Sequence, residues 1–275
     1  MKIGNYNVSV HNMGNFALDG GSMFGSVPKN LWNRKLPADE QNRIPLATNS
    51  VLLEGENKKI LVDVGNGSKW PDKLKEIYAI ETFPESDLAF KFAEITDVIL
   101  THLHFDHAGG ISYYDVNQEL QLSFPNAKIH LQKSNLENAK NPTIKERASY
   151  FKENWGPIEQ AELNLLDGNT EILPGIFSHL INGHTRGQQW IRIKGETETL
   201  VIPSDLMPTS HHVPVAFHMG YDICAGTLLE EKSNFLKQAT ENNWIVLFQH
   251  DRDKVAGRIS LNEKRQFAIS ECVDL

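Results

Sequence analysis

The sequence predicts an α/β fold in which two β-sheets pack face to face and helices cover their outer surfaces. Apolar, strand-like runs fall into two groups along the chain, and helical segments follow each group. No linker, repeat or low-complexity tract separates the two groups. We therefore expect residues 1–275 to form a single domain.

The first group of strands occupies the N-terminal half of the chain. Residues 2–11 alternate as a strand does, whereas residues 12–46 combine several Gly and Pro residues with no sustained period, which predicts a long loop. Residues 50–53 and 59–62 predict a hairpin that turns at Gly55-Glu56-Asn57. Beyond it, the pattern predicts helices at 71–80, 86–95 and 132–152 and strands at 97–101 and 127–131.

The second group of strands follows at residues 177–182, 188–194 and 198–203. A helix is then predicted at 227–241, because apolar residues recur there on one face. These residues are Leu228, Leu229, Phe235, Leu236 and Ala239. A last strand is predicted at 244–249.

The charge of the chain argues against nucleic acid as a partner. The sequence has 27 basic and 35 acidic residues, a formal net charge of −8. Two divalent cations would reduce this charge only to about −4, and no Lys- or Arg-rich stretch offsets it. We therefore expect a small-molecule substrate.

The sequence shows neither a targeting signal nor a disulfide framework. The N-terminal residues show no secretory hydrophobic segment, and no apolar run approaches the roughly 20 residues of a membrane helix. Cys224 and Cys272 lie far apart and do not indicate a disulfide framework, and we expect Cys224 in the core. We expect a cytoplasmic protein with no membrane partner.

The segment His102-Leu103-His104-Phe105-Asp106-His107 is the most informative feature of the chain. It follows the apolar run 97–101, and Gly109-Gly110 comes shortly after it. Side chains at i and i+2 of an extended chain point the same way, so His102 and His104 reach one metal ion together. Asp106 and His107 lie where strand turns into helix and face a second ion. Chance clustering explains the segment poorly, because four such groups would otherwise repel and desolvate one another.

This segment resembles the signature of the metallo-β-lactamase superfamily, and other motifs follow in the family's order between residue 47 and about residue 251. Gly183-His184-Thr185 is similar to the family's Gly-His-Thr segment. Two further apolar strands end in Asp205 and His250, and Asp63 matches the early Asp-x-Gly position, where the family has a supporting residue rather than a ligand. The resemblance implies the four-layer αββα sandwich.

The resemblance also implies a dinuclear metal site. In the implied ligand set His102, His104 and His184 hold one ion, Asp106, His107 and His250 hold the other, and Asp205 bridges them. The ions are two divalent metals, Zn²⁺ by default, with Mn²⁺, Fe²⁺ or cobalt depending on supply. A closed structural zinc site fits less well, since such sites usually use four ligands that include several cysteines.

The implied chemistry is hydrolysis. A metal-bridging hydroxide would attack an ester or lactone carbonyl, Asp205 would hold the two ions together, and Asp106 would pass a proton to the leaving oxygen. A phosphoester substrate is an alternative, as is a metal-binding relative without turnover.

Within the superfamily, the motif is most similar to that of the N-acyl homoserine lactonases. True β-lactamases usually lack an acid equivalent to Asp205, and flavodiiron proteins replace His104 by an acid. Glyoxalase II has a helical extension longer than the 25 residues that follow His250. The related nucleases do not suit the negative charge. Methyl parathion hydrolase-like enzymes, which cleave organophosphate triesters, stay possible.

The substrate-binding residues are less directly indicated. The lactonases place a tyrosine three residues after the bridging acid, where this chain has Pro208, and Tyr221 is the replacement that we expect. His211 and His212 lie near Asp205 in the sequence and are expected to line the pocket. Phe24, with Met23 and Trp32, is expected to form an apolar wall, the alternative being that these residues only hold the 12–46 segment in place. Three histidines within strand patterns are expected to be structural, namely His11, His130 and His179.

Overall fold

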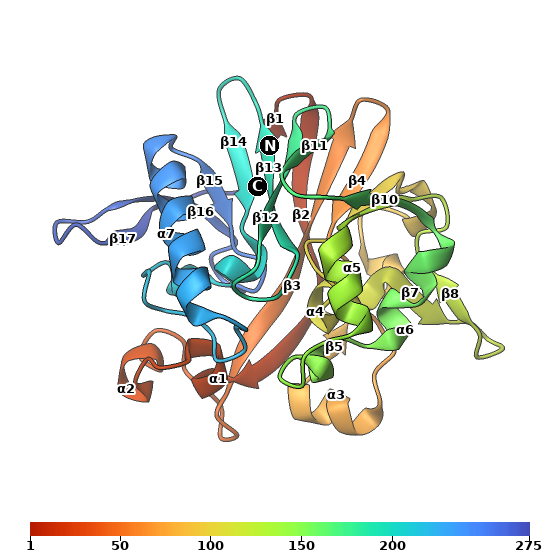
Figure 1. Cartoon of the computed structure of the whole chain (residues 1–275), viewed down its shortest axis with the longest axis horizontal. Helices are drawn as coiled ribbons and strands as arrows, with labels where there is room; N and C mark the ends of the chain where they lie inside the picture. Colours follow the sequence, from red (N-terminus) through yellow and green to blue (C-terminus); the bar gives the residue numbers. More distant parts are fainter.

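The computed structural model describes all 275 residues, Met1–Leu275, and its architecture is the predicted αββα sandwich (Figure 1). The first sheet has eight strands, in the order β1-β2-β3-β4-β6-β9-β10 with β5 paired to β2. The second sheet has seven strands in the order β11 to β17, and β7 and β8 form a separate hairpin. None of the helices combines the length and the apolar composition that a membrane span requires.

The strands of the first sheet are β1 (Lys2–Ile3), β2 (Tyr6–Asp19), β3 (Arg43–Gly55), β4 (Lys58–Val62), β5 (Glu81–Thr82), β6 (Asp97–Ile99), β9 (Lys128–Gln132) and β10 (Glu162–Leu166). Those of the second sheet are β11 (Thr170–Leu173), β12 (Ile176–Ile181), β13 (Gln188–Lys194), β14 (Thr199–Ile202), β15 (Ile245–Leu247), β16 (Ala256–Leu261) and β17 (Phe267–Cys272). The hairpin strands are β7 (Ser112–Tyr114) and β8 (Leu120–Leu122).

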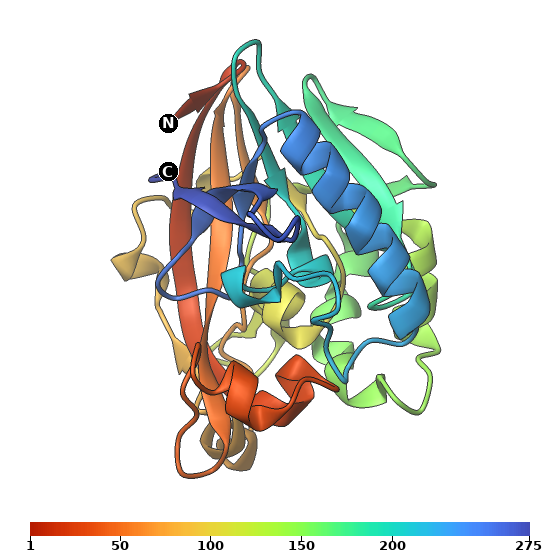
Figure 2. The same ribbon diagram turned by 90° about the vertical axis from the view of Figure 1, so that its left-hand side faces the viewer.

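The α-helices are α1 (Gly20–Phe24), α2 (Lys29–Trp32), α3 (Asp72–Tyr78), α4 (Phe105–Ala108), α5 (Lys133–Lys140), α6 (Lys152–Trp155) and α7 (Ala225–Glu241). Figure 2 shows α1 and α2 at one end of the long strands β2 and β3, while both chain termini lie near the other end. The helix α7 runs along the outer face of the second sheet (Figure 2).

Alternate residues of the central strands face different layers, which explains why these strands read as continuous apolar runs. In β3, Val51 and Leu53 pack between the two sheets, whereas Leu52 packs in the helical layer outside the first sheet. In β14, Leu200 packs between the sheets and Val201 packs in the core that contains α7. Each such side chain stabilises the fold by about 1.5–3 kcal/mol through burial, so both faces of each sheet hold the layers together.

Several predicted elements are confirmed. The helix predicted at 71–80 is α3, and the helix predicted at 227–241 is α7, with its apolar face buried at Leu228, Phe235 and Leu236. The predicted hairpin joins β3 to β4, and the predicted strands at 97–101 and 127–131 are β6 and β9.

The expectation of one long loop over residues 12–46 was wrong. The strand β2 continues to Asp19 and β3 already begins at Arg43, so the two ends of this segment pair with each other as strands, and the residues between them include α1 and α2. A shift of register between Asn12 and Asn15 accommodates Gly14, where β2 also pairs with β5. The bulge therefore keeps a long strand continuous where the glycines suggested a loop.

Other predicted boundaries were also wrong. Residues 86–95 contain two short 3₁₀ turns, Glu85–Asp87 and Phe92–Glu94, rather than a helix, and Phe90 and Ile95 are the residues of this segment buried in the core. Residues 132–152 are helical only in α5 and in short turns after it. The strand at 244–249 is not the last, since β16 and β17 extend the second sheet beyond it.

Candidate active site

The histidine-rich segment leaves the first sheet at the end of β6. Its four polar side chains are all buried, with exposed fractions of 0% for His102, 6% for His104, 8% for Asp106 and 1% for His107. His102 and His104 lie in the extended stretch before α4, and Asp106 and His107 lie in the first turn of that helix. The change from strand to helix thus turns four potential ligands towards one place.

Three further polar side chains reach this place from the second sheet. His184 follows β12, Asp205 lies in the 3₁₀ turn η6 (Ser204–Leu206) after β14, and His250 follows β15. All three are buried. Because β14 and β15 are parallel, Asp205 and His250 leave the sheet at the same edge.

The seven side chains form two groups that share Asp205. One group is His102, His104, His184 and Asp205, and the other is Asp106, His107, Asp205 and His250; within each group the candidate ligand atoms lie within 4.8 Å of one another.

Asp205 stands between the two groups. Its Oδ2 lies 3.3 Å from His184 Nε2, and its Oδ1 lies 3.0 Å from His250 Nε2 and 3.2 Å from His107 Nε2. One carboxylate thus presents a separate oxygen to each group.

The donor set fits divalent cations. The Nε2 atoms of His102 and His104 are buried without a hydrogen-bond partner, an arrangement that costs about 1–3 kcal/mol per group unless a ligand compensates it. Ring nitrogens of different histidines also face one another, with His184 Nε2 3.1 Å from His104 Nδ1 and His250 Nε2 3.0 Å from His107 Nε2. Lone pairs that converge in this way suit a cation placed between them.

The electrostatics of the site favour positive charge. Burial, together with the neighbouring imidazoles, holds the pKa of His102 and of His104 well below the usual value, so both rings are neutral. Burial also disfavours protonation of His107, but the carboxylates of Asp205, Asp106 and Asp63 outweigh this effect and hold its pKa well above the usual value. The end of the site around His107 therefore attracts a cation.

Asp63 fixes the orientation of His107, in agreement with the supporting role predicted for it. The His107 Nδ1–H donates to Asp63 Oδ2 at 2.9 Å, so Nε2 is the ring nitrogen that faces Asp205 and the site. Thr101 donates to Asp63 through its backbone N–H and its hydroxyl, both at 2.7 Å, and Gln249 Nε2 donates at 2.8 Å. Asp63 itself adopts the left-handed φ of 56°, which these hydrogen bonds stabilise.

His184 and His250 are oriented in the same manner. The His184 Nδ1–H donates to Asp222 Oδ1 at 2.8 Å, and the His250 Nδ1–H donates to the backbone carbonyl of Ala47 at 2.8 Å. Asp222 is in turn held by the backbone N–H of Met219 at 2.8 Å. The pairing of Asp222 with His184 joins residues 38 positions apart and could not be recognised from the sequence without the fold.

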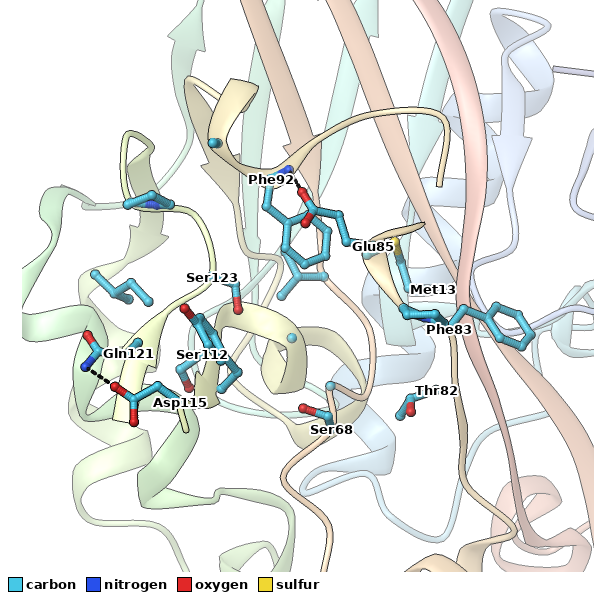
Figure 3. A pocket seen from close by; sticks show the side chains of 18 residues that line it. Met13, Ser68, Thr82, Phe83, Glu85, Phe92, Ser112, Asp115, Gln121 and Ser123 are labelled. Atoms are coloured by element: carbon cyan, nitrogen blue, oxygen red, sulfur yellow. Dashed lines mark hydrogen bonds between the residues drawn. The ribbon is translucent and has the colours of Figure 1, made fainter. Parts of the chain in front are cut away.

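Five of the seven side chains, those of His104, Asp106, His184, Asp205 and His250, line a small cavity of about 130 Å³. A larger cavity of about 870 Å³ lies against the residues that follow Asp63 and the histidine-rich segment (Figure 3). It contains no histidine, lysine or arginine, and two of its acids, Glu85 and Asp115, accept hydrogen bonds from Phe92 and Gln121 (Figure 3). The chemistry therefore identifies the smaller cavity as the candidate active site.

The wall of the small cavity combines apolar and polar side chains. Its apolar residues come from β2, β3, the N-terminal helices and α4, and include Phe16, Leu18, Met23, Leu46 and Phe105. Besides the metal-type ligands, its polar lining residues include Tyr221, Lys145 and Glu146. Neither Lys145 nor Glu146 was identified from the sequence, because the helix predicted over 132–152 gave them no special position.

Only one of the four predicted substrate-binding residues lines this cavity, and it is Tyr221. Phe24 is fully buried and stacks between the rings of Trp32 and His212. His212 is also buried, and it bonds to the backbone carbonyl of Met23 at 2.8 Å. The expectation that Phe24 and His212 contact substrate therefore does not agree with their burial.

His211 also lies outside the small cavity. It lines a separate one with Thr209 and Asp251, on the other side of His250. The prediction that Cys224 is a core residue was wrong, because it lies exposed at the start of α7. The histidines expected to be structural lie away from the seven candidate ligands; for example, His130 is buried and pairs with Asp97 at 2.8 Å.

Comparisons with known proteins agree with this geometry. The family model described as the metallo-beta-lactamase superfamily matches residues 43–250. An N-acyl homoserine lactonase from Bacillus cereus is 27% identical over 228 residues, which cover 75% of this chain and 82% of that protein.

Among solved structures, a probable metal-dependent hydrolase from Staphylococcus aureus is 28% identical, with a TM-score of 0.89 over 99% of this chain and 100% of that one. AidC, a dizinc quorum-quenching lactonase in complex with a product, N-hexanoyl-L-homoserine, has a TM-score of 0.79 at 20% identity, covering 100% of this chain and 97% of that one. The chain therefore belongs to the metallo-β-lactamase superfamily, as a hydrolase related to the N-acyl homoserine lactonases.

Proposed function

We propose that this protein is a hydrolase of esters or lactones that depends on two divalent metal ions, with zinc as the expected metal. The observation that supports this proposal most strongly is the convergence of seven buried ligands into two groups that share Asp205. Three of the histidines have their Nδ1–H groups engaged by Asp63, Asp222 and a backbone carbonyl, so their Nε2 atoms are available as ligands.

The roles of the protein groups follow from their positions. When bound at such sites, divalent ions lower the pKa of water to about 7 and polarise a carbonyl oxygen. Asp205 would hold the two groups at a fixed separation. Asp106 lines the cavity, so its carboxylate is placed to accept a proton and return it to the leaving oxygen.

The cavity favours a substrate with an apolar part. Phe16, Leu18 and Met23 offer apolar surface for an acyl group, and Tyr221 adds a hydroxyl donor to the cavity lining. Burial raises the pKa of Tyr221 to about 12, so its hydroxyl keeps its proton at neutral pH. The activity named for the lactonase relatives supports the choice of lactones among the possible esters.

The experiment is proton release at neutral pH from acyl homoserine lactones, simple lactones, aryl esters and an aryl phosphotriester, with metal-loaded and chelator-stripped protein. We expect metal-dependent hydrolysis of lactones or esters, its loss in His104→Ala, and full activity in His211→Ala, whose side chain lies outside the cavity. Faster cleavage of the phosphotriester would move the protein to the organophosphate hydrolases. No turnover with two ions bound would instead favour a non-catalytic relative.

A further inference from the structure

We propose that Lys145 recognises a carboxylate on the substrate, away from the bond that is cleaved. This inference rests on the proposed function and narrows its substrate class to esters or lactones that carry an anionic group. Among the residues that line the small cavity, Lys145 is the only lysine or arginine.

The ammonium group of Lys145 has donors left for a ligand. Its Nζ donates to the backbone carbonyl of Asp222, and the side chain forms no salt bridge. An ammonium group has three N–H donors and no acceptor. Two donors are therefore available at the cavity wall.

The neighbouring carboxylate does not satisfy this ammonium group. Glu146 also lines the cavity, but its Oε2 accepts from the Thr185 hydroxyl at 2.7 Å, and its Oε1 accepts from Asn138 Nδ2 at 3.2 Å and from the Thr143 hydroxyl at 3.1 Å. Glu146 is 4% exposed, so its carboxylate is held by the protein interior. Lys145 is thus the charged group that remains free to meet a substrate.

The apolar residues of the cavity offer no second group that could recognise a carboxylate. The cavity is also lined by the apolar side chains of Phe16, Leu18 and Leu46, which cannot distinguish a carboxylate from a neutral group by hydrogen bonding. One hydrogen bond between charged groups therefore determines whether an anionic substituent is favoured. We expect a preference of about tenfold, which corresponds to about 1.4 kcal/mol.

A purely positioning role for Lys145 makes a different prediction. The lysine contacts the backbone of Asp222, whose carboxylate orients His184. If Lys145 acted only through this contact, its loss would slow all substrates equally and would weaken metal binding. The ratio between charged and neutral substrates separates the two roles.

The test uses two lactones that differ in one group, γ-butyrolactone with a carboxylate on its γ-carbon and the corresponding carboxamide. Ring opening of either consumes one water and releases one proton at neutral pH, so kcat/KM is measured for both by proton release. We expect the metal-loaded protein to prefer the carboxylate, Lys145→Met to lower the ratio about tenfold, and Lys145→Arg to retain it. The matched control is Lys152→Met, because Lys152 is exposed in α6 and does not line the cavity.

A second readout is independent of turnover. Calorimetry measures the Kd of the ring-opened dicarboxylate and of its carboxamide analogue, and Lys145→Met should weaken only the dicarboxylate. An unchanged ratio and unchanged Kd values in Lys145→Met would overturn the inference, as would a parallel loss for both compounds. If the protein binds both compounds but opens neither lactone, the Kd comparison still decides the role of Lys145, and the panel of lactones and esters described above decides the proposed function separately.

Discussion

The two halves of the candidate site are built in different ways. The first sheet supplies His102, His104, Asp106 and His107 from six consecutive residues after β6. The second sheet supplies His184, Asp205 and His250 from the ends of three strands. The first half is therefore local, since one change from strand to helix arranges it, whereas the second half forms only when the sheet is assembled.

The supporting contacts follow the same division. His107 is held by Asp63, which follows β4 of the first sheet, and His184 is held by Asp222, in the loop before α7. His250 is the exception, because it follows β15 of the second sheet but donates to the carbonyl of Ala47 in β3 of the first sheet. Substitutions on either side should reveal whether the halves act separately or as one unit.

The largest effect is expected from the residue that joins the halves. Asp205→Asn removes a charge from both groups, so we expect metal occupancy to fall to one ion or less and hydrolysis to fall by more than about 100-fold. Metal analysis and proton release measure the two quantities on the same sample. Unchanged occupancy of two ions would show that Asp205 does not bridge the groups.

The next effect separates the two halves. Asp63→Asn and Asp222→Asn each disturb the orientation of one ligand, His107 or His184, and should each weaken metal binding by about 10–100-fold. Competition with a chelator measures the affinity of each of the two metal ions separately. We expect each variant to weaken a different ion; loss of the same ion in both would mean that the halves are not independent.

Lys232 contacts the loop that carries Asp222, which orients His184 in the second half of the site. This lysine of α7 is fully buried and donates to the backbone carbonyls of Pro214 and Phe217, in the loop that leads to Asp222. Burial lowers its pKa to about 7 from the ordinary 10.5. Between these values the unfolded chain holds a proton that the folded protein has lost, so stability rises with pH.

The expected slope from Lys232 is at most about 1.4 kcal/mol per pH unit between about pH 7 and 10. Urea unfolding of the native protein and of Lys232→Met at several pH values measures it. The difference in unfolding free energy between the two proteins should grow with pH in favour of the native protein. A pH-independent difference would refute this account of Lys232.

The smallest effect is expected from Tyr221→Phe. This change removes only a hydroxyl at the cavity wall, so KM should rise several-fold, by about the 0.5–1.5 kcal/mol of a neutral hydrogen bond, while metal content stays the same. Steady-state kinetics on the best lactone and metal analysis check both. Unchanged kinetics would remove Tyr221 from the substrate site.

The half of the site that follows β6 could be predicted from the sequence, since four candidate ligands lie there within six consecutive residues. Only the resemblance to a family identified His184, Asp205 and His250, because the local sequence does not predict which strand ends lie next to one another. The roles of Asp222, Lys145 and Glu146 were missed for the same physical reason, as each depends on contacts between segments far apart in sequence.

The errors in the fold have a related origin. Glycines and prolines between residues 12 and 46 suggested a loop, but Gly14 lies at a bulge and Pro45 lies within β3 opposite Ala17. Tertiary pairing thus overrides the local signal. The same pairing brings Leu18 and Leu46 to the cavity, and this wall could not be predicted from the sequence.

Metal stoichiometry tests the central claim most directly. Stripped protein titrated with Zn²⁺ should bind two ions, whereas His107→Ala and His184→Ala should each bind one ion tightly, because each variant loses a ligand of a different group. Binding of a single ion by the native protein, or loss of both ions in either variant, would contradict a site made of two groups joined through Asp205.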